Sequence, residues 1–356
     1  MLSGLTGSVQ AELDRLFGTL DDSPHPDRKV SAQAFSKARR GFSAAVFRRL
    51  NATLLSLVER HLAVPRWRGL RVVAADASKL RLFGQDATGR KVREAIAFLL
   101  YLPGLELTLD FELYSPSVGE RQMLFEHLEL IHADDLLVLD RGYPARWLVA
   151  ALLALGRPFC IRVDATGFAA ARRFLRSGQV EAVVDLPRPS ARDAVDYAVP
   201  RVASTVRLVR VVTPSGRVQV LLTSLLDAEA FPAADFGALY HARWRIEETF
   251  KRIKHRLALE QVSGLTWLAA QQDFGAKVVC DNLNALAAFA AAPEPVARPG
   301  GAPATTYRPN RTAAFQTLKT RFQQWLTGTL PTLAEIQDIL TRLLTDLVQI
   351  VPGRSK

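Results

Sequence analysis

The order of apolar runs between residues 69 and 164 is compatible with only a few folds. Three consecutive runs have strand character, and Pro103 with Gly104 supplies a turn between the second and the third. The runs are, in chain order, the strands LRVVAADAS, REAIAFLLY and LELTLDFELY, the helix ERQMLFEHLELI, the strand DLLVLD, the helix PARWLVAALLAL and the strand PFCIRVD. This order predicts an α/β fold in which helices cover both faces of a mixed sheet.

The segments around this core differ in pattern. Residues 165–230 contain three further strand patterns, and helical periodicity returns after them. Five prolines and two glycines between residues 292 and 309 predict a linker. We therefore expect a helical N-terminal region at 1–68, a core at 69–164 and 231–291, a β-rich insertion at 165–230, a linker at 292–309 and a helical C-terminal region at 310–356.

Two aspartates occupy matching positions in the predicted core. Asp76 ends the first strand and Asp140 ends the fourth, and these strands are neighbours in a mixed sheet of this connectivity. Two adjacent carboxylates repel each other unless a cation lies between them, and oxygen ligands suit Mg²⁺ or Mn²⁺. Either residue alone would be read as a strand cap, but the matched pair favours a metal site. Asp164 also ends a strand, which we expect at the sheet edge, further from the centre.

A strongly basic helix follows the insertion. The stretch LYHARWRIEETFKRIKHRL, residues 239–257, contains six Lys or Arg and two adjacent glutamates. At 3.6 residues per turn, four charged residues fall with Tyr240 in a sector of roughly 80°, beside an apolar stripe. These four are Arg243, Glu247, Lys251 and Lys254. An amphipathic surface helix with a Glu247–Lys251 ion pair is the simpler interpretation, but it leaves four surplus positive charges, so we expect the stripe to face a cleft.

Together these residues resemble the insertion-sequence-4 type of DDE transposases. The spacing Tyr240-x2-Arg243-x3-Glu247-x6-Lys254 matches the signature helix of that family. Asp76-Ala-Ser78 resembles its first acidic motif and Asp140-Arg-Gly-Tyr143 its second. The run GERQMLFEHL before the second motif, and the runs EQVSG and QQDFGAKVVCDNL after the third, also resemble the family. The resemblance extends from about residue 30 to the C-terminus.

The resemblance implies a ribonuclease-H-like core and a set of site residues. Asp76, Asp140 and Glu247 would be catalytic and would hold two Mg²⁺ ions, with Mn²⁺ as a possible substitute. The implied reaction is cleavage of transposon ends followed by transfer of a DNA strand to a target. Tyr240, Arg243 and Lys254 would bind DNA near the cut end, and Lys251 belongs to the same stripe.

The charge of the chain agrees with a polyanionic partner. The formal net charge is +11 and the isoelectric point about 10.0, which favours nucleic acid or an acidic surface. Arg141 and Lys79, next to the acids, are candidate phosphate ligands, and Arg39 and Arg40 place sequence-specific binding in the N-terminal helices. We expect double-stranded DNA as the partner, in the form of terminal inverted repeats and target DNA, bound by a homodimer in a synaptic complex.

The cysteines and the hydropathy of the chain bear on its cellular compartment. Two cysteines in apolar runs suit a cytosolic compartment, and the lack of a long uncharged apolar stretch argues against a membrane span. With these observations the resemblance implies a bacterial cytoplasmic protein at the nucleoid, with no membrane partner. Two other functions stay open: a metal-dependent nuclease of the same fold that cuts without joining, and a catalytically idle DNA-binding protein descended from a transposase. The presence of all three acids argues against the idle protein.

Overall fold

The structure is a computed structural model that divides the chain into two compact units. It describes residues 8–21, 23, 25–85, 88–89, 91–164, 168–213, 215–291, 306–311, 314–315, 317–318, 321 and 331–350. Unit 1 comprises Met1–Asn51, Arg81–Arg93 and Arg252–Lys356, and unit 2 comprises Ala52–Leu80 and Glu94–Lys251. No helix among the described residues is long and apolar enough to cross a membrane.

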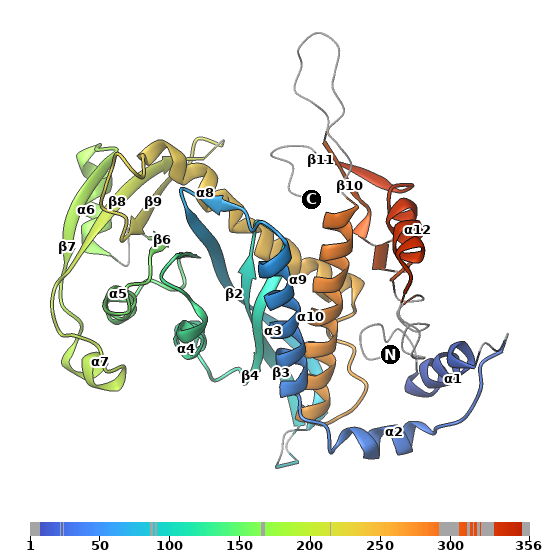
Figure 1. The fold of residues 1–356 in the computed structure, drawn as a ribbon. Coiled ribbons are helices and arrows are strands. Elements are labelled where there is room, and N and C mark those ends of the chain that lie inside the picture. The colour runs from blue at the N-terminus through green and yellow to red at the C-terminus, as the bar shows by residue number, and fades with distance from the viewer. Residues whose placement is uncertain are drawn as a thin grey trace, which may run out of the picture. The chain divides into compact units, whose positions relative to one another are not determined.

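Most of the secondary structure falls close to where the periodicity predicted it (Figure 1). The helices are α1 (Val9–Leu20), α2 (Ala32–Arg39), α3 (Ala45–His61), α4 (Glu120–Glu126), α5 (Arg146–Ala154), α6 (Ala169–Ser177), α7 (Ala191–Asp196), α8 (Phe236–Ala242), α9 (Trp244–Arg256), α10 (Trp267–Ala290) and α12 (Leu333–Leu343). The strands are β1 (Arg66–Trp67), β2 (Leu70–Gln85), β3 (Lys91–Leu102), β4 (Leu107–Tyr114), β5 (Asp135–Leu139), β6 (Phe159–Val163), β7 (Glu181–Leu186), β8 (Ser204–Val212), β9 (Val218–Thr223), β10 (Thr306–Pro309) and β11 (Leu347–Ile350).

One mixed sheet organises unit 2 and confirms the predicted α/β class. Its strand order is β4-β3-β2-β5-β6-β9-β8-β7, with β1 beside β2. The first and fourth strands of the predicted core, β2 and β5, are parallel neighbours as expected, and β5 also pairs in parallel with β6. The order β4-β3-β2-β5-β6 is the arrangement expected of a ribonuclease-H-like core.

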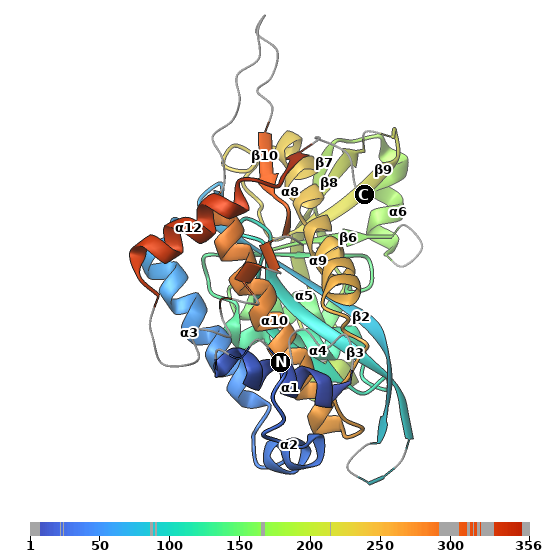
Figure 2. The ribbon, with the colours of Figure 1, turned by 90° about the vertical axis from the view of Figure 1, so that its right-hand side faces the viewer.

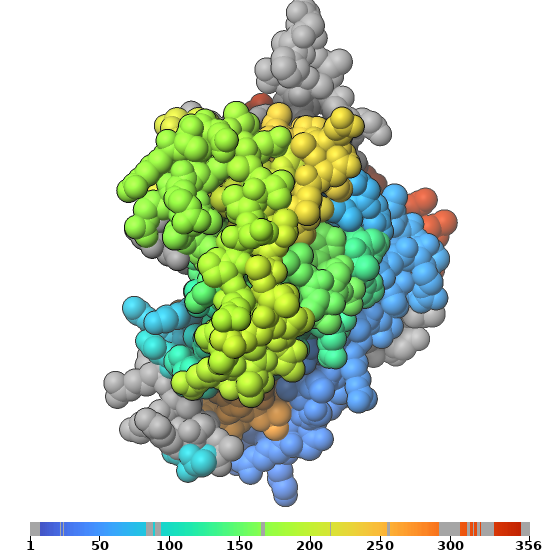
Figure 3. Space-filling model, turned by 90° about the vertical axis from the view of Figure 1, so that its left-hand side faces the viewer, coloured from blue at the N-terminus to red at the C-terminus, as the bar shows by residue number. Residues whose placement is uncertain are grey.

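The β-rich stretch at 165–230 extends this sheet instead of forming a sheet of its own. β9 pairs antiparallel with β6, and β8 and β7 follow in turn. The prediction that the fifth core strand lies at the sheet edge is therefore wrong, because β9 satisfies the free edge of β6. Figure 3 shows, in light green to yellow-green, the surface that this stretch presents on one face of unit 2.

The central strands are buried on both faces, which explains their unbroken apolar runs. All five residues of β5 are buried, and so are Val73, Ala74 and Ala75 of β2. β2 runs on to Gln85, so Asp76 lies within a long strand and does not end it, contrary to prediction. β2 pairs with β3 on one side and with β5 on the other.

The basic helix predicted over residues 239–257 is divided in two. α8 ends at Ala242 and α9 begins at Trp244, with Arg243 at the junction. The backbone N–H of Arg243 bonds to the carbonyl of Tyr240 at 3.2 Å, a tighter step than an α-helical turn. Ile246 and Phe250, the first two residues of the predicted apolar stripe, are buried.

Unit 1 is organised by α10, a helix of 24 residues drawn in orange in Figures 1 and 2. Residues 306–309, expected to belong to a linker, form β10, which pairs antiparallel with β11. The sequence pattern gave no sign of this pair, since both strands are four residues long. The rest of the predicted linker and most of the predicted helix after Asn310 lie outside the described residues.

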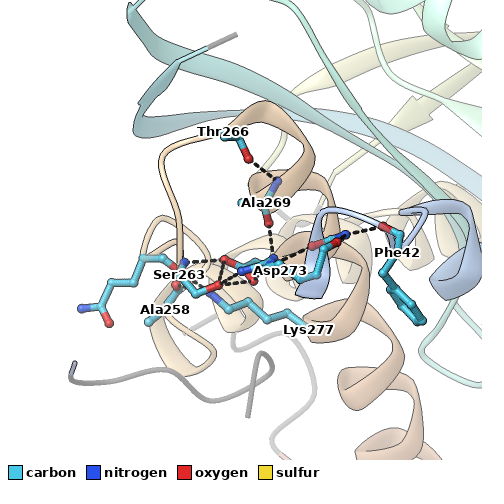
Figure 4. Close-up of polar contacts among 10 residues, drawn as sticks. Phe42, Ala258, Ser263, Thr266, Ala269, Asp273 and Lys277 are labelled. Atoms are coloured by element: carbon cyan, nitrogen blue, oxygen red, sulfur yellow. Dashed lines mark hydrogen bonds and ion pairs between the residues drawn. The ribbon is translucent and has the colours of Figure 1, made fainter. Parts of the chain in front are cut away.

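A buried polar network in unit 1 fixes the end of α2 against α10 (Figure 4). The Arg39 guanidinium donates to the Gln272 side chain at 2.6 Å, to the Ala269 carbonyl at 3.0 Å and to Asp273 Oδ1 at 3.0 Å. It also bonds to Ser263, whose hydroxyl donates to Asp273. Every nitrogen of this guanidinium is thus engaged within the protein, and we do not retain Arg39 as a DNA-binding residue.

Replacing Arg39 should destabilise the protein much more than replacing its neighbour. In Arg39→Ala the buried Asp273 carboxylate loses its cationic partner, and we expect the free energy of unfolding to fall by about 3–5 kcal/mol. Arg40 is exposed, so Arg40→Ala should change it by less than about 0.5 kcal/mol. Urea denaturation of both variants measures the difference, and equal effects would show that the network is not stabilising.

Candidate active site at the β2–β5 strand pair

Strand register places Asp76 beside Asp140. The last pair of residues in the parallel β2–β5 ladder is Ala74 and Val138. Asp76 and Asp140 each stand two residues beyond that pair, so the two side chains leave the sheet on the same face and at the same level. The convergence predicted from the strand order therefore follows directly from the pairing.

Arg243 joins Asp76 to Glu247. Its guanidinium lies 4.0 Å from Asp76 Oδ2 through Nη1 and donates to Glu247 Oε1 at 2.6 Å through Nη2. The Arg243 side chain is only 3% exposed. Its position at the α8–α9 junction turns the side chain inward. The break in the basic helix thus places one cation between two of the three acids.

Burial and like charge make the Asp76 carboxylate costly to ionise. Desolvation, reinforced by the nearby charges of Asp140 and Glu247, raises the pKa of Asp76 to about 7. The attraction of Arg243 and a hydrogen bond from the Ala77 N–H act in the opposite direction and are outweighed. The site therefore carries more negative charge than its own cation neutralises.

A fourth carboxylate, Glu120, stands next to Asp140. An added Cβ on Gly142 would lie 2.9 Å from Glu120 Oε2 and 3.0 Å from Asp140 Oδ1. Burial and the charge of Asp140 raise the pKa of Glu120. The sequence had drawn attention to the run GERQMLFEHL, which contains Glu120, but assigned no role to any residue in it.

Two tyrosine hydroxyls are buried beside the acids without a hydrogen-bond partner among the described residues. Tyr143, the last residue of the Asp-Arg-Gly-Tyr motif, is fully buried, and burial followed by the charges of Asp76, Glu120 and Asp140 raises its pKa. Tyr240 is 4% exposed and packs in the core of unit 2, with Arg243 over its ring at 5.5 Å. Burial also raises the pKa of Tyr240.

The donor set fits a divalent ion at Asp76 and Asp140. Both ligands are carboxylates, Asp76 is 18% exposed, and the ionised form of Asp76 lacks sufficient positive charge nearby. Glu247 is committed to Arg243 in this conformation, and no three His, Cys, Asp or Glu side chains among the described residues are grouped closely enough to hold one ion. Asp110, a buried acid on β4, is engaged elsewhere, since His127 Nδ1 lies 2.7 Å from its Oδ2.

The other basic residues predicted to bind DNA are distributed differently. Tyr240 and Arg243 are buried, Lys251 is exposed and pairs with Glu248 at 2.8 Å, and Lys254 lies in the part of α9 that belongs to unit 1. Burial lowers the pKa of Lys254. Lys79, Arg141 and Arg40 are exposed. The sequence did not indicate that two of the four signature residues of this helix, Tyr240 and Arg243, are buried.

Arg141 lines a pocket that contains two further arginines. The pocket has a volume of about 120 Å³, and Arg162, Asp164 and Arg217 contribute to its walls. Arg162 also lies close enough to Tyr240 to lower the pKa of its hydroxyl. The sequence gave Arg162 and Arg217 no role, because strands β6 and β9 become neighbours only in the folded sheet.

Comparison with known proteins identifies a family model that matches the chain. The family model described as "Transposase DDE domain" matches residues 67–283, which is more than half of the chain. A curated relative, "Transposase InsG for insertion sequence element IS4" of Escherichia coli (strain K12), is 26% identical over 242 residues, covering 64% of this chain and 54% of the relative. The alignment thus spans about half the length of that relative.

A solved structure is also similar over most of the chain. It is titled "Cryo-EM structure of piggyBac transposase synaptic complex with hairpin DNA (SNHP)". The match has a TM-score of 0.42 and 10% identity, and it covers 98% of this chain and 77% of that one.

Removing the Asp76 charge should stabilise the metal-free protein in a pH-dependent way. A carboxyl whose pKa is raised from 3.8 to about 7 in the folded state binds more protons folded than unfolded, so the stability of the native protein declines as pH rises between those values. Asp76→Asn escapes this loss. In EDTA the melting temperature of Asp76→Asn should exceed that of the unsubstituted protein. This difference should grow from pH 4 to pH 7 and stay constant above pH 7.

The exposed Glu129 provides the control for this measurement. Glu129→Gln removes the same charge from a residue outside the site and should show no such pH-dependent margin. A margin for Asp76→Asn that stays flat with pH would contradict the raised pKa.

Proposed function

Because the chain belongs to the Transposase DDE domain family, we propose that it is the transposase of a bacterial insertion sequence. In this proposal it binds the terminal inverted repeats of its element in the cytoplasm, cleaves the DNA ends and transfers them to target DNA. The observation that carries the proposal is the position of Asp76 and Asp140 at one level of the β2–β5 pair, with Glu247 held beside them through Arg243.

Asp76 and Asp140 would hold a divalent ion, Mg²⁺ with Mn²⁺ as a substitute. Such ions lower the pKa of an attacking water or 3′-hydroxyl and stabilise the leaving oxygen. Glu247 would complete the ligand set after its carboxylate leaves Arg243. The surroundings of Asp76 oppose its ionisation in the free protein. A bound divalent ion would offset this cost by stabilising the ionised carboxylate.

Arg243 acts on the acids in this proposal before it acts on DNA. In the free protein it keeps Glu247 on the side of Asp76 and offsets part of the carboxylate charge. Once Glu247 is released, the guanidinium is available for a phosphate of the bound DNA end. Tyr240, which stacks under the same guanidinium, would hold it in position during this exchange.

The DNA backbone would follow the arginines of the pocket that Arg141 lines. Arg141, Arg162 and Arg217 line one pocket, and Arg141 directly follows Asp140 in the chain. A phosphate flanking the cut site would be neutralised there. Arg40, Lys79, Lys251 and Lys254 would extend the contacts, and two copies of the chain would bring two DNA ends together in a synaptic dimer.

Replacing any of the three acids should abolish the chemistry. With a substrate carrying the sequences that flank the coding region, Asp76→Asn, Asp140→Asn and Glu247→Gln should each lower the rate of end cleavage on the order of a thousandfold, since several kcal/mol of transition-state stabilisation is lost. Glu129→Gln should leave the rate unchanged. Gel analysis of cleavage and of joined products measures both steps.

The outcomes separate the alternative functions. Cleavage without joining of a 3′-hydroxyl end to target DNA would identify a nuclease. Binding of DNA with no cleavage by the unsubstituted protein would identify an idle DNA-binding protein. Full activity of all three variants would refute the assignment of the acids.

The arginine pocket makes a separate prediction about salt. Each phosphate contact contributes about one unit to the slope of log Kd against log salt concentration. The double variant Arg141→Gln with Arg217→Gln should therefore reduce that slope by about two. Arg192→Gln, which removes an exposed arginine paired with Asp196 on α7, is the control and should leave the slope unchanged. An unaltered slope in the double variant would place the DNA elsewhere.

A further inference from the structure

Glu120 and Asp140 direct their carboxylates at the same small region of unit 2. Glu120 Oε2 and Asp140 Oδ1 both lie within about 3 Å of the point that a Cβ on residue 142 would occupy, at 2.9 and 3.0 Å. Two oxygens bound to one Mg²⁺ at roughly 2.1 Å each are at most about 4 Å apart. The two distances to this point place Glu120 Oε2 and Asp140 Oδ1 at most about 6 Å apart, so a side-chain shift of roughly 2 Å or less would bring both oxygens within reach of one ion.

Backbone and side-chain hydrogen bonds hold the two acids in this arrangement. The Gly142 N–H donates to Asp140 Oδ1 at 2.7 Å, and the Arg121 guanidinium donates through Nε to the Gly142 carbonyl at 3.1 Å. Arg121 is the second residue of α4 and Glu120 the first, so this bond fixes the start of α4 against the turn after β5. The approach of Glu120 to Asp140 is consequently built into the packing of the two segments.

A purely structural role at the start of α4 does not explain why Glu120 lies beside Asp140. An acid in the first turn of a helix is stabilised by the backbone N–H groups and normally gains from being ionised. The Glu120 carboxylate instead lies beside the like charge of Asp140, where both acids approach Gly142.

The hydroxyl of Tyr143 gives an independent indication of a missing occupant. Tyr143 is fully buried, its hydroxyl has no hydrogen-bond partner among the described residues, and the charges of Asp76, Glu120 and Asp140 all act on it. A buried donor without an acceptor is costly. The charges of three acids reach this hydroxyl, yet none of them accepts its hydrogen bond; an oxygen ligand of an ion bound beside the acids, such as water, would supply the missing acceptor.

We propose that Glu120 is a fourth carboxylate ligand of the divalent-ion site, where it shares an ion with Asp140. This inference rests on the proposed function, because it assumes that Asp76 and Asp140 hold that ion. With Glu120 included, four carboxylates would be available to two ions. Glu120 and Asp140 approach Gly142, and Asp76 and Glu247 approach Arg243.

The test is the affinity of the full chain for Mn²⁺ alone, measured by electron paramagnetic resonance of the free ion without DNA. Glu120→Gln keeps the shape of the side chain and removes its charge, and we expect it to weaken Mn²⁺ binding tenfold or more. Glu120→Asp keeps the carboxylate on a shorter side chain, and its Mn²⁺ affinity should lie between that of Glu120→Gln and that of the unsubstituted chain. Glu129→Gln, an equal change of charge at an exposed position, should bind as the unsubstituted chain does. Asp140→Asn should weaken binding at least as much as Glu120→Gln.

The melting temperature in EDTA shows whether each variant is folded, and we expect Glu120→Gln to be no less stable than the unsubstituted chain, because a repulsion is removed. If Glu120→Gln binds Mn²⁺ normally while Asp140→Asn does not, the role of Glu120 is refuted and the proposed function stands. If Asp140→Asn also binds normally, or the unsubstituted chain binds no Mn²⁺, both fail together. If Glu129→Gln weakens binding as much as Glu120→Gln, the effect is one of net charge and the assignment of Glu120 is overturned.

Discussion

Two carboxylates held side by side by a buried parallel strand pair are the constraint on which the rest of the site depends. Asp76 and Asp140 are held close, because β2 and β5 are paired in register up to Ala74 and Val138, two residues before each aspartate, in the centre of the sheet. Their repulsion is not relieved by distance or by full solvation. The surroundings compensate with backbone N–H groups from Ala77 and Gly142 and with the buried guanidinium of Arg243.

This compensation is incomplete, and the negative charge that is left uncompensated indicates a cation site. Desolvation and the neighbouring acids hold the pKa of Asp76 at about 7 although Arg243 is close. Arg243 divides its charge between Asp76 and Glu247, and its Nε and Nη1 atoms find no hydrogen-bond acceptor among the described residues. Asp76 and Glu247 share the single guanidinium of Arg243, and Asp140 adds a further negative charge beside Asp76, so the site is short of positive charge. A divalent ion is the simplest group that would supply it.

The sequence was sufficient to predict that the first and fourth core strands are neighbours with Asp76 and Asp140 at matching positions, because apolar runs mark the strands and their order limits the topology. It did not predict that the stretch at 165–230 continues the sheet beyond β6. It also identified the helix that carries Glu247 by its excess of cations. The division of that helix at Arg243 was beyond prediction, since residues 239–257 have continuous helical periodicity and only packing against the core turns Tyr240 and Arg243 inward. Arg39 was predicted to bind DNA for a similar reason: its charge is visible in the sequence, but its partners Ser263 and Asp273 are more than 200 residues away.

The position of Glu120 and the arginine pocket likewise depend on tertiary contacts that the sequence pattern does not reveal. Glu120 lies in a run that resembled the family, yet nothing in its spacing from Asp140 indicated contact until α4 was placed against the turn after β5. Arg162 and Arg217 become neighbours of Arg141 only because β9 pairs with β6. The strands β10 and β11 are too short for a periodicity argument, and their pairing depends on segments 40 residues apart.

The central claim is that the β2–β5 pair holds a divalent ion through Asp76 and Asp140. Anomalous diffraction at the manganese edge, from crystals of the full chain soaked in Mn²⁺, tests it most directly. The account predicts a peak within about 2.5 Å of carboxylate oxygens of both Asp76 and Asp140, with the Glu247 carboxylate no longer bonded to Arg243. A peak bound elsewhere, or full Mn²⁺ occupancy at another site with Asp76 and Asp140 unligated, would contradict it.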